Sequence, residues 1–348
     1  MPSDPRIVRL GLIGCGRVAA ERHLPALRHV DGFRLAAAAD RDAARLAPFD
    51  IAQRHLDYRE LLERSDVDAV GILTPTASHV DIALAALAAG KHVLIEKPLA
   101  LNVAECDRLI ERAAVSPGKV VVGFNLRWHR LVRRARLLVA GGALGRVTAI
   151  RSAYTHERTG DNAPDWHRKR ESGGGVLLNE AVHHFDLWHH LLGAEVEQIF
   201  AATRHSSRYE DECSAVTATL EGGVLATGIF AFRTSANSEI EIFGEKGRLC
   251  LNCYRFDGLE FYPWSGYPGD PRDRFGKWVA AARELPAALS VLRRGGEFAD
   301  TFRGLWQHFN DCISGNRPSE CTLQDGKRAI EVAAASVASA SAGKPVRI

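Results

Sequence analysis

Short apolar runs alternate with helical patterns through the first 125 residues, and this alternation most limits how the chain can fold. Three of the runs are 6–13, 33–40 and 92–96, and each is followed by a segment with apolar residues at helical spacing. Strands this apolar need cover on both faces, and helical crossovers between them require parallel pairing. The segment is therefore predicted to form a parallel sheet with helices on both sides.

The rest of the chain is organised differently. Its 348 residues exceed one typical core, which suggests two domains, and we place them at 1–125 and 126–348. Strand patterns with glycine-containing turns occur at 145–156 and then follow one another over 195–256 without intervening helices, as in an antiparallel sheet. Residues 278–292 have a helical pattern that Pro286 is expected to break.

The first apolar run ends in the glycine-rich sequence GCGRVA, with Gly14, Gly16 and Ala19 in the pattern G-x-G-x-x-A. The first glycine permits a tight turn, the second lets a pyrophosphate approach the backbone, and the alanine allows close helix–strand packing. The N–H groups at the start of the next helix favour phosphate. Asp40 ends the second strand about 20 residues on, where a carboxylate can bind ribose hydroxyls; its alternative role is to cap the helix that follows.

Polar residues follow several of the other predicted strands. Thr74 and Pro75 come after one strand, the Glu-Lys-Pro sequence at 96–98 after the next, and Asn125 after the last. The carboxyl ends of parallel strands share one edge of a sheet, which is where ligands bind. These residues and the glycine loop are therefore predicted to line one crevice.

Composition excludes several classes of function. A net charge of +3 without long runs of Lys and Arg argues against nucleic acid, and the basic stretch 127–136 has the spacing of a solvated helix face. No run approaches the roughly 18 apolar residues of a membrane span, and no leader pattern precedes the first strand. Seven scattered cysteines are typical of a reducing compartment, so we expect a cytoplasmic protein. Cys250 and Cys253 lack a second pair, and no metal site is predicted there.

Four segments of the chain together resemble the Gfo/Idh/MocA oxidoreductases: GCGRVA, TPTASHVDIALAALAAGKHVLIEKPLA, VVVGFNLRW and GGGVLLNEAVHHFDLWHHLLG. The resemblance extends to the ending TLQDGKRAIEVAAASVASASAGKPVRI. Its specific part is the EKP sequence combined with GGG-x₇-H-x₂-D.

The resemblance implies an α/β Rossmann domain with a doubly wound parallel sheet that binds NAD or NADP. It also implies a C-terminal α+β domain whose open, mostly antiparallel sheet faces the substrate and packs other subunits. Typical substrates of the family are sugars, cyclitols, sugar acids and nucleotide sugars. A homodimer or homotetramer is expected, because an open apolar sheet face is not left bare in water.

Lys97 is the candidate for proton transfer. Oxidation of a secondary alcohol by a nicotinamide needs a group within hydrogen-bond reach that takes the hydroxyl proton. Burial beside a positively charged ring opposes the charged form of a lysine. Glu96 either opposes this effect on Lys97 or holds the cofactor, and it is counted among the cofactor-binding residues. An ion pair with Glu96 is the alternative role for Lys97. Pro98 makes the turn rigid, and the bond before it can be cis.

The glycine triplet precedes a helix with a second polar set. Asn179, His183 and Asp186 are spaced i, i+4 and i+7, which places them on one face of a regular helix. The family usually has Asp where this chain has Asn179, and an amide cannot accept a proton. Proton transfer would then rest on Lys97 and His183, while Asn179 orients a hydroxyl. Asp186 either orients His183 or pairs with a neighbouring base.

The same helix contains four histidines, including His184 and His190. His183, Asp186 and His190 have a spacing that metal ligands can adopt. A single histidine near the substrate is the ordinary arrangement, so we predict no metal. His184 is expected to face the sheet or solvent.

The remaining candidates come from the resemblance. Trp166 can stack on a sugar ring or pack in the core. Asp40 repels a 2′-phosphate and favours NAD, whereas Arg41 can stack on adenine or pair with that phosphate, which leaves NADP open. The predicted cofactor-binding residues are Gly14, Gly16, Arg17, Val18, Asp40, Arg41, Thr74, Pro75, His79, Glu96, Lys97 and Asn125. The predicted substrate-binding residues are Lys97, Arg127, Trp166, Asn179 and His183, with His156, Arg158 and Arg170 as further candidates.

The leading hypothesis is an NAD(P)-dependent dehydrogenase or reductase acting on a secondary hydroxyl of a sugar, cyclitol or related polyol, with Lys97, His183 and Asn179 as its catalytic residues. Two alternatives stay open. One is an NAD-dependent glycosidase that oxidises a ring hydroxyl transiently. The other is a non-catalytic protein that senses the cofactor, which the Asn179 departure would favour.

Overall fold

The computed structural model describes residues 7–157, 164–265 and 271–348, without the side chains of 271–274, 277 and 280. Two compact units are present, each built from three segments of the chain. The first unit is Met1–Asn125, Glu171–Gly173 and Phe302–Ile330, and the second is Leu126–Arg170, Gly174–Thr301 and Glu331–Ile348. The domains predicted at 1–125 and 126–348 stay a prediction.

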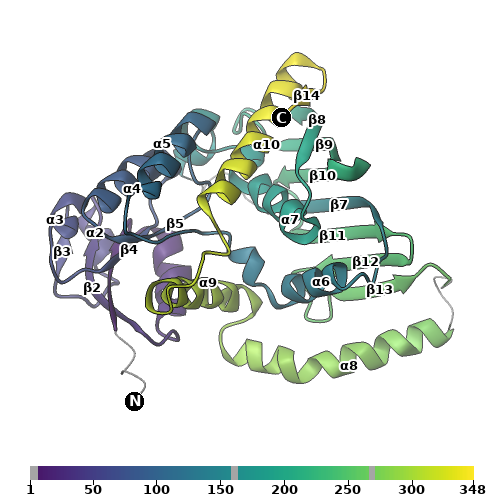
Figure 1. Cartoon of the computed structure of the whole chain (residues 1–348), viewed down its shortest axis with the longest axis horizontal. Coiled ribbons are helices and arrows are strands. Elements are labelled where there is room, and N and C mark those ends of the chain that lie inside the picture. Colours follow the sequence, from purple (N-terminus) through teal and green to yellow (C-terminus); the bar gives the residue numbers. More distant parts are fainter. Residues whose placement is uncertain (1–6, 158–163, 266–270) are drawn as a thin grey trace. The chain divides into compact units, whose positions relative to one another are not determined.

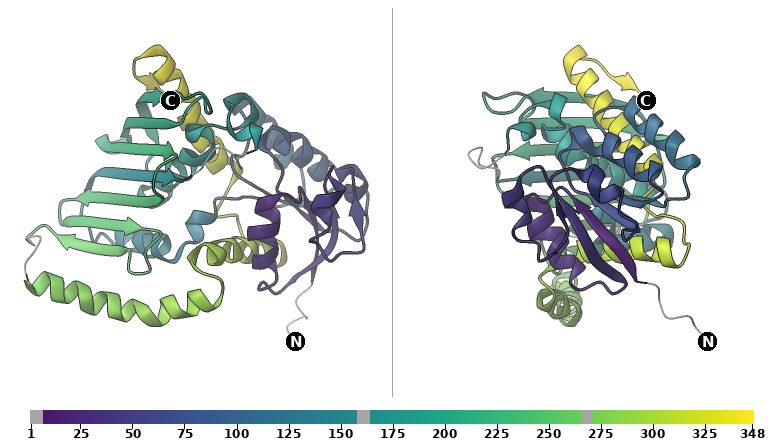
Figure 2. Two further views of the ribbon diagram at one scale, coloured as in Figure 1. Left: turned by 180° about the vertical axis from the view of Figure 1, so that it is seen from behind. Right: turned by 90° about the vertical axis from the view of Figure 1, so that its left-hand side faces the viewer.

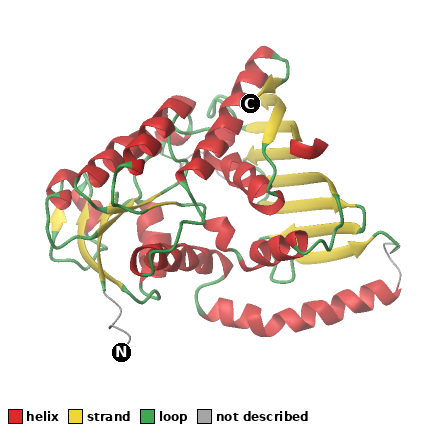
Figure 3. Ribbon diagram, in the orientation of Figure 1, coloured by secondary structure: helices red, strands yellow, loops and turns green. Residues whose placement is uncertain are grey.

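The first unit contains a six-stranded sheet of order β3-β2-β1-β4-β5-β6 in which every pair is parallel. This confirms the predicted doubly wound sheet (Figure 3). The strand order reverses between β1 and β4, so a ligand crevice is expected at their carboxyl ends. The strands are β1 Val8–Ile13, β2 Phe33–Ala39, β3 Arg54–His55, β4 Ala69–Ile72, β5 His92–Ile95 and β6 Val120–Val122.

Two helices of this unit begin or end at the signals expected from the sequence. Asn102 caps α5 by accepting the N–H of Glu105 at 3.0 Å, and Gly90 has a φ of +70° just after α4. Helix α9 packs so closely that a Cβ built on Gly71 of β4 would lie 2.8 Å from the ring of Trp306. The helices are α1 Leu24–Leu27, α2 Ala43–Leu46, α3 Tyr58–Leu62, α4 His79–Ala88, α5 Val103–Ala114, and the parts of α9 (Glu297–Ser314) and α10 (Leu323–Ala342) that belong to this unit.

The second unit contains an eight-stranded sheet of order β13-β12-β11-β7-β10-β9-β8-β14. Only the β7–β10 pair is parallel, so the predicted mostly antiparallel sheet is confirmed. The short strands β13 and β14 were not predicted. The strands are β7 Val147–His156, β8 Val196–Arg204, β9 Cys213–Leu220, β10 Val224–Phe232, β11 Asn237–Gly244, β12 Gly247–Asn252, β13 Leu259–Pro263 and β14 Val346–Arg347.

The two faces of this sheet differ. Helices α6 (Arg130–Ala140) and α7 (Val182–Leu192) cover one face, and the strands lie side by side in the left view of Figure 2. The other face exposes Phe200, Leu225 and Ile229 at 41%, 55% and 48%. The described part of this face is thus partly apolar and uncovered in the single chain.

Helix α8 spans Pro271–Arg293 and continues through Pro286, so the predicted break is wrong (Figure 1). A proline removes one N–H and displaces the carbonyl four residues earlier. Here Pro286 and Ala282 are both exposed, so water can bind that carbonyl. Glu284 forms ion pairs with Arg130 and Arg134, which tie α8 to α6.

None of the helices in the described ranges is both long enough and apolar enough to span a bilayer.

Candidate active site

The glycine loop after β1 has the geometry of a phosphate-binding turn. Gly14 has a φ of +90°, and a Cβ there would lie 2.7 Å from the backbone N of Thr74, so only glycine fits. A Cβ on Gly16 would meet only Nη1 of Arg45, at 4.0 Å. The protein's own packing therefore does not require glycine at position 16, which fits a ligand that approaches the loop. Val18 is 48% exposed beside it.

The side chain of Asp40 stabilises this loop by hydrogen bonding. Its Oδ2 accepts the N–H of Cys15 at 2.8 Å, and its Oδ1 accepts the N–H of Asp42 at 2.9 Å. The helix cap is Asp42, which accepts the N–H of Ala44 at 3.0 Å. The alternative role for Asp40 as cap of α2 is therefore wrong. Since a carboxylate has about four acceptor positions, Asp40 can still bind ribose hydroxyls.

Arg45 is a basic residue near the loop that the sequence reasoning missed. The basic residues predicted there were Arg41, which is exposed, and Arg17, which forms an exposed ion pair with Glu21 at 3.0 Å. The guanidinium of Arg45 lies near Gly16 instead. Its position in the short helix that follows Asp40 was the available signal.

The loop after β4 is joined to the turn after β5 by a buried histidine. His79 places Nε2 2.8 Å from the carbonyl O of Thr74 and Nδ1 2.8 Å from the carbonyl O of Pro98. Burial lowers the pKa of His79 below its ordinary value. Ser78 donates to Oγ1 of Thr74 at 2.9 Å and to the carbonyl O of Pro75. If His79 contributes to cofactor binding, it therefore does so indirectly, by holding these two loops in place.

Glu96 and Lys97 directly follow β5, which ends at Ile95. Oε1 of Glu96 lies 2.9 Å from Nε2 of His23, and Oε2 accepts the backbone N–H of Lys97 at 3.0 Å. Burial alone would raise the pKa of Glu96, but His23 and the positive charge of Lys97 hold it below its ordinary value. Lys97 is half-buried, and the Lys97–Pro98 bond is cis, as the sequence allowed.

The glycine triplet leads into a π-helical turn, Leu177–Ala181, and then into α7. The assumption of regular helical spacing from Asn179 is therefore wrong, because a π-turn has more residues per turn than an α-helix. Asn179 is buried, and its Nδ2 lies 3.2 Å from Nδ1 of His167. His183 is also buried.

Asp186 binds Arg127 in a buried, two-point ion pair. The distances are 2.8 Å from Nε to Oδ2 and 2.5 Å from Nη2 to Oδ1, and the side chains are 5% and 2% exposed. Of the two roles predicted for Asp186, pairing with a neighbouring base is therefore observed, and the base is Arg127. The guanidinium of Arg127, a predicted substrate contact, is engaged in it.

Asp211 is a second residue that the sequence reasoning missed. A Cβ on Gly175, whose φ is +82°, would lie 1.8 Å from Oδ1 of Asp211. Oδ2 accepts the N–H of Leu177 at 2.9 Å, so this carboxyl anchors the start of the π-turn. Burial raises the pKa of Asp211 to about 6. No local motif marks Asp211, because its partners lie about 35 residues earlier.

The other candidates are spread over the second unit. Trp166 is half-buried against His167, with ring centroids 3.8 Å apart, and Arg170 pairs with Glu210. His156 lies 3.7 Å from Glu180. His184 is fully buried against Tyr154 and Phe230, so it faces the sheet, and burial lowers its pKa to about 3. Arg158 lies outside the described residues. Across the described ranges, no group of three or more His, Cys, Asp and Glu side chains is arranged to hold a metal.

Each unit thus gathers its own part of the predicted site. The first unit contains the glycine loop, Asp40, Thr74, Lys97 and the buried Asn125. The second contains Arg127 and the residues after the glycine triplet. Convergence of Lys97 and His183 on one substrate stays a prediction.

Comparison with known proteins agrees with this geometry. Residues 8–124 match an oxidoreductase family with an NAD-binding Rossmann fold, the Gfo/Idh/MocA family, and residues 132–250 match the C-terminal domain of that family. A myo-inositol 2-dehydrogenase from Thermotoga maritima is 30% identical over 260 residues, covering 70% of this chain and 74% of the relative. A dTDP-3,4-didehydro-2,6-dideoxy-alpha-D-glucose 3-reductase from Actinomadura kijaniata is 30% identical over 330 residues, or 92% of each chain.

Among solved structures, an oxidoreductase domain protein from Kribbella flavida is 26% identical, with a TM-score of 0.83 over 99% of this chain and 100% of the other. The family resemblance and the assignment of NAD as cofactor are therefore confirmed. The chain belongs to the Gfo/Idh/MocA family of oxidoreductases, whose first domain is an NAD-binding Rossmann fold.

Proposed function

We propose that this oxidoreductase transfers a hydride between NAD and a secondary hydroxyl or keto group of a sugar, cyclitol or related polyol. The observation that carries the proposal is the glycine loop, where Gly14 is required by packing and Gly16 is not. Asp40 beside it supplies carboxylate oxygens for a ribose and favours NAD over NADP. NAD, when bound, supplies the hydride acceptor.

Lys97 and His183 are proposed to share proton transfer at the substrate oxygen. Lys97 follows β5 at the carboxyl edge of the sheet, and its backbone N–H donates to Oε2 of Glu96. His183 is a buried imidazole on α7. Asn179 can donate to or accept from a hydroxyl but cannot take its proton, so it is assigned to orientation.

The substrate class is inferred from the relatives. One is named as an inositol dehydrogenase and the other as a reductase of a deoxysugar nucleotide. The first name denotes a polyhydroxylated six-membered carbocycle, and the second a six-membered sugar ring with keto groups at the carbons that can be reduced. The half-buried Trp166 is proposed to stack on such a ring.

Replacement of Lys97 by alanine tests the proposal. Lys97→Ala should lower turnover by about 10²-fold or more, the scale of a lost general acid or base, while NAD affinity is kept. Turnover is followed as NADH absorbance over a panel of cyclitols and sugars, and cofactor affinity as NADH fluorescence. Lys344→Ala, at an exposed position, is the control. Near-normal turnover of the Lys97 variant would refute the role of Lys97.

The two alternatives give different results in the same assays. Hydrolysis of a nitrophenyl glycoside without net formation of NADH would indicate the NAD-dependent glycosidase. Tight binding of NAD with no turnover across the panel would indicate a sensing protein.

We also propose that a second copy of the chain covers the open face of the eight-stranded sheet. Phe200, Leu225 and Ile229 are exposed there, and apolar patches of this kind mark interfaces. Leu225→Glu combined with Ile229→Lys should lower the molar mass measured by light scattering after gel filtration. Val115→Glu, at an apolar position in the first unit that is 75% exposed, should not. An unchanged mass for the double variant would contradict this interface.

A further inference from the structure

We propose that Trp306 and His23 are positioning residues for Lys97, acting through a buried chain of hydrogen bonds that passes through Glu96. This inference rests on the function proposed for Lys97. Neither Trp306 nor His23 belongs to the motifs that identify the site, and neither ends a strand at the crevice.

The chain of hydrogen bonds joins three separate segments of the first unit. Nε1 of Trp306, in α9, lies 3.1 Å from Nδ1 of His23, in the π-helical turn that follows the glycine loop. Nε2 of His23 lies 2.9 Å from Oε1 of Glu96, at the end of β5. Oε2 of Glu96 accepts the backbone N–H of Lys97 at 3.0 Å. Trp306 and His23 are 0% exposed and Glu96 is 8% exposed, so water does not compete for these bonds.

The donors and acceptors in this chain fix the tautomer of His23. An indole N–H can only donate, so Nδ1 of His23 must be the acceptor. The proton of the neutral ring therefore lies on Nε2, which donates it to Glu96. Glu96 in turn accepts from both sides as a carboxylate, which agrees with its lowered pKa. Each polar atom in the chain is thus either a donor or an acceptor, and all the hydrogen bonds point toward Glu96 or, at Nδ1, toward His23.

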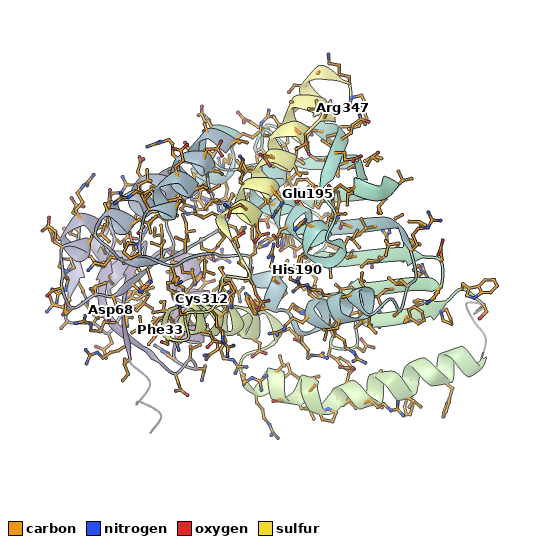
Figure 4. The ribbon with its side chains drawn as sticks, in the orientation of Figure 1. Phe33, Asp68, His190, Glu195, Cys312 and Arg347 are labelled. Atoms are coloured by element: carbon orange, nitrogen blue, oxygen red, sulfur yellow. The ribbon has the colours of Figure 1, made fainter. Side chains whose placement is uncertain are left out.

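Aromatic packing keeps the imidazole in this orientation. The His23 ring is T-shaped against Phe302, with centroids 4.8 Å apart, and against Trp306, at 5.7 Å. Phe33, labelled in Figure 4, also packs against Trp306 in a T-shaped arrangement, with ring centroids 5.6 Å apart. On the far side of Lys97, His79 holds the carbonyl O of Pro98. The backbone on both sides of Lys97 is therefore tied to buried side chains.

These contacts imply a consequence for catalysis. A proton-transfer group that is displaced by a fraction of an ångström to 1 Å loses much of its effect, up to about 10²-fold in rate. If Trp306 no longer directs the His23 tautomer, Glu96 loses its fixed donor and the turn that bears Lys97 can shift. The loss should appear in kcat, because the hydrogen bonds by which Asp40 holds the glycine loop, from the N–H groups of Cys15 and Asp42, do not pass through this chain.

The test is Trp306→Phe, which keeps an aromatic ring and removes the N–H. We expect kcat to fall by about 10-fold to 100-fold, with KM and NAD affinity nearly unchanged. The matched control is Phe309→Leu. Phe309 is fully buried one turn along α9 and contacts Trp306 and Phe33, but its side chain has no polar atom that could join the chain of hydrogen bonds. Phe309→Leu should lower the melting temperature at least as much and leave kcat near that of the parent.

The tautomer is measured independently of activity. In ¹⁵N-histidine spectra of the parent enzyme, the His23 signals, assigned by their absence in His23→Gln, should report a proton on Nε2. In Trp306→Phe the proton should redistribute toward Nδ1. His23→Gln, which keeps a donor for Glu96, should also retain more kcat than His23→Leu.

The outcomes separate the two proposals. If Lys97→Ala is inactive but Trp306→Phe has the kcat of the parent, or no more loss than Phe309→Leu, the positioning role is wrong and the function of Lys97 stands. If Lys97→Ala is active, the function of Lys97 fails, and the tautomer spectra still decide whether the chain of hydrogen bonds exists. A proton on Nδ1 in the parent would overturn the chain itself.

Discussion

Removal of the carboxylate of Asp186 should destabilise the second unit strongly. Asp186→Ala leaves the guanidinium of Arg127 in a site where its side chain is 5% exposed, without the two bonds of 2.8 and 2.5 Å that it now donates. Breaking one partner out of a buried ion pair costs about 3–5 kcal/mol. For a domain of about 150–250 residues, 1 kcal/mol shifts the melting temperature by roughly 2–4 °C. The expected loss is therefore about 6–20 °C.

The measurement is thermal unfolding of Asp186→Ala, Arg127→Met and the combination Arg127→Met with Asp186→Leu, followed by circular dichroism. The combined variant removes both charges and should be more stable than either single variant, since a buried ion pair can often be replaced by apolar residues with little loss. Glu245→Ala is the control in the same unit. It breaks an exposed pair with Arg146 at 2.9 Å and should cost about 1 kcal/mol or less.

The same variants decide what Arg127 contributes to activity. If Arg127 only holds Asp186, the combined variant should keep measurable turnover once it is folded. If Arg127 also binds substrate, the combined variant should be stable with a raised KM. A shift below about 3 °C for Asp186→Ala would refute the reasoning, because it would mean that the pair is not desolvated as its burial implies.

Two further predictions follow from backbone and burial. Gly16→Ala should keep the melting temperature of the parent but weaken NAD binding by roughly an order of magnitude, since its Cβ would intrude on the ligand and not on the protein. Gly14→Ala should lower both the melting temperature and the affinity for NAD, because it adds the strain of a φ of +90°, about 1–2 kcal/mol, to a contact with Thr74. Calorimetry measures the stability and NADH fluorescence the affinity. The same effect of both variants on the melting temperature would contradict this prediction. Asp211 has its pKa raised from 3.8 to about 6, so its native form binds a proton more tightly than the unfolded form. The stabilisation from protonated Asp211 should be complete below about pH 4 and disappear as the pH rises through about 6, a change of up to about 3 kcal/mol in the free energy of unfolding. Urea unfolding at pH 4.5 and 7.5 should show this loss of stability in the parent and not in Asp211→Asn. An equal change of stability in the two proteins would count against the prediction.

The parallel sheet could be predicted because each of its buried strands is a local apolar run with a clear end. Strand β3, Arg54–His55, has only two residues at the sheet edge and leaves no periodic signal. The continuation of α8 through Pro286 was missed for another reason. A proline breaks a helix when the freed carbonyl is buried, and the exposure that removes this penalty is a tertiary property.

The site residues that the sequence identified all lie in local motifs, such as Gly14, Asp40 and Lys97. Those that it missed act through partners distant in the chain. Asp211 meets the glycine triplet about 35 residues earlier, and Trp306 meets His23 across 283 residues. A single sequence contains no pattern that links such pairs, so their roles follow from the three-dimensional contacts alone.

The first unit is completed by a late segment of the chain, Phe302–Ile330, and this affects how the unit folds during translation. When translation reaches Asn125, the nascent nucleotide-binding sheet has neither the indole that covers Gly71 nor the carbonyl of Cys321 that binds the N–H of Val122. At about 5–20 residues per second, these arrive roughly 10–40 s later. During that interval the incomplete core of the first unit exposes apolar surface to which chaperones can bind. A chain truncated near residue 125 would keep this surface exposed.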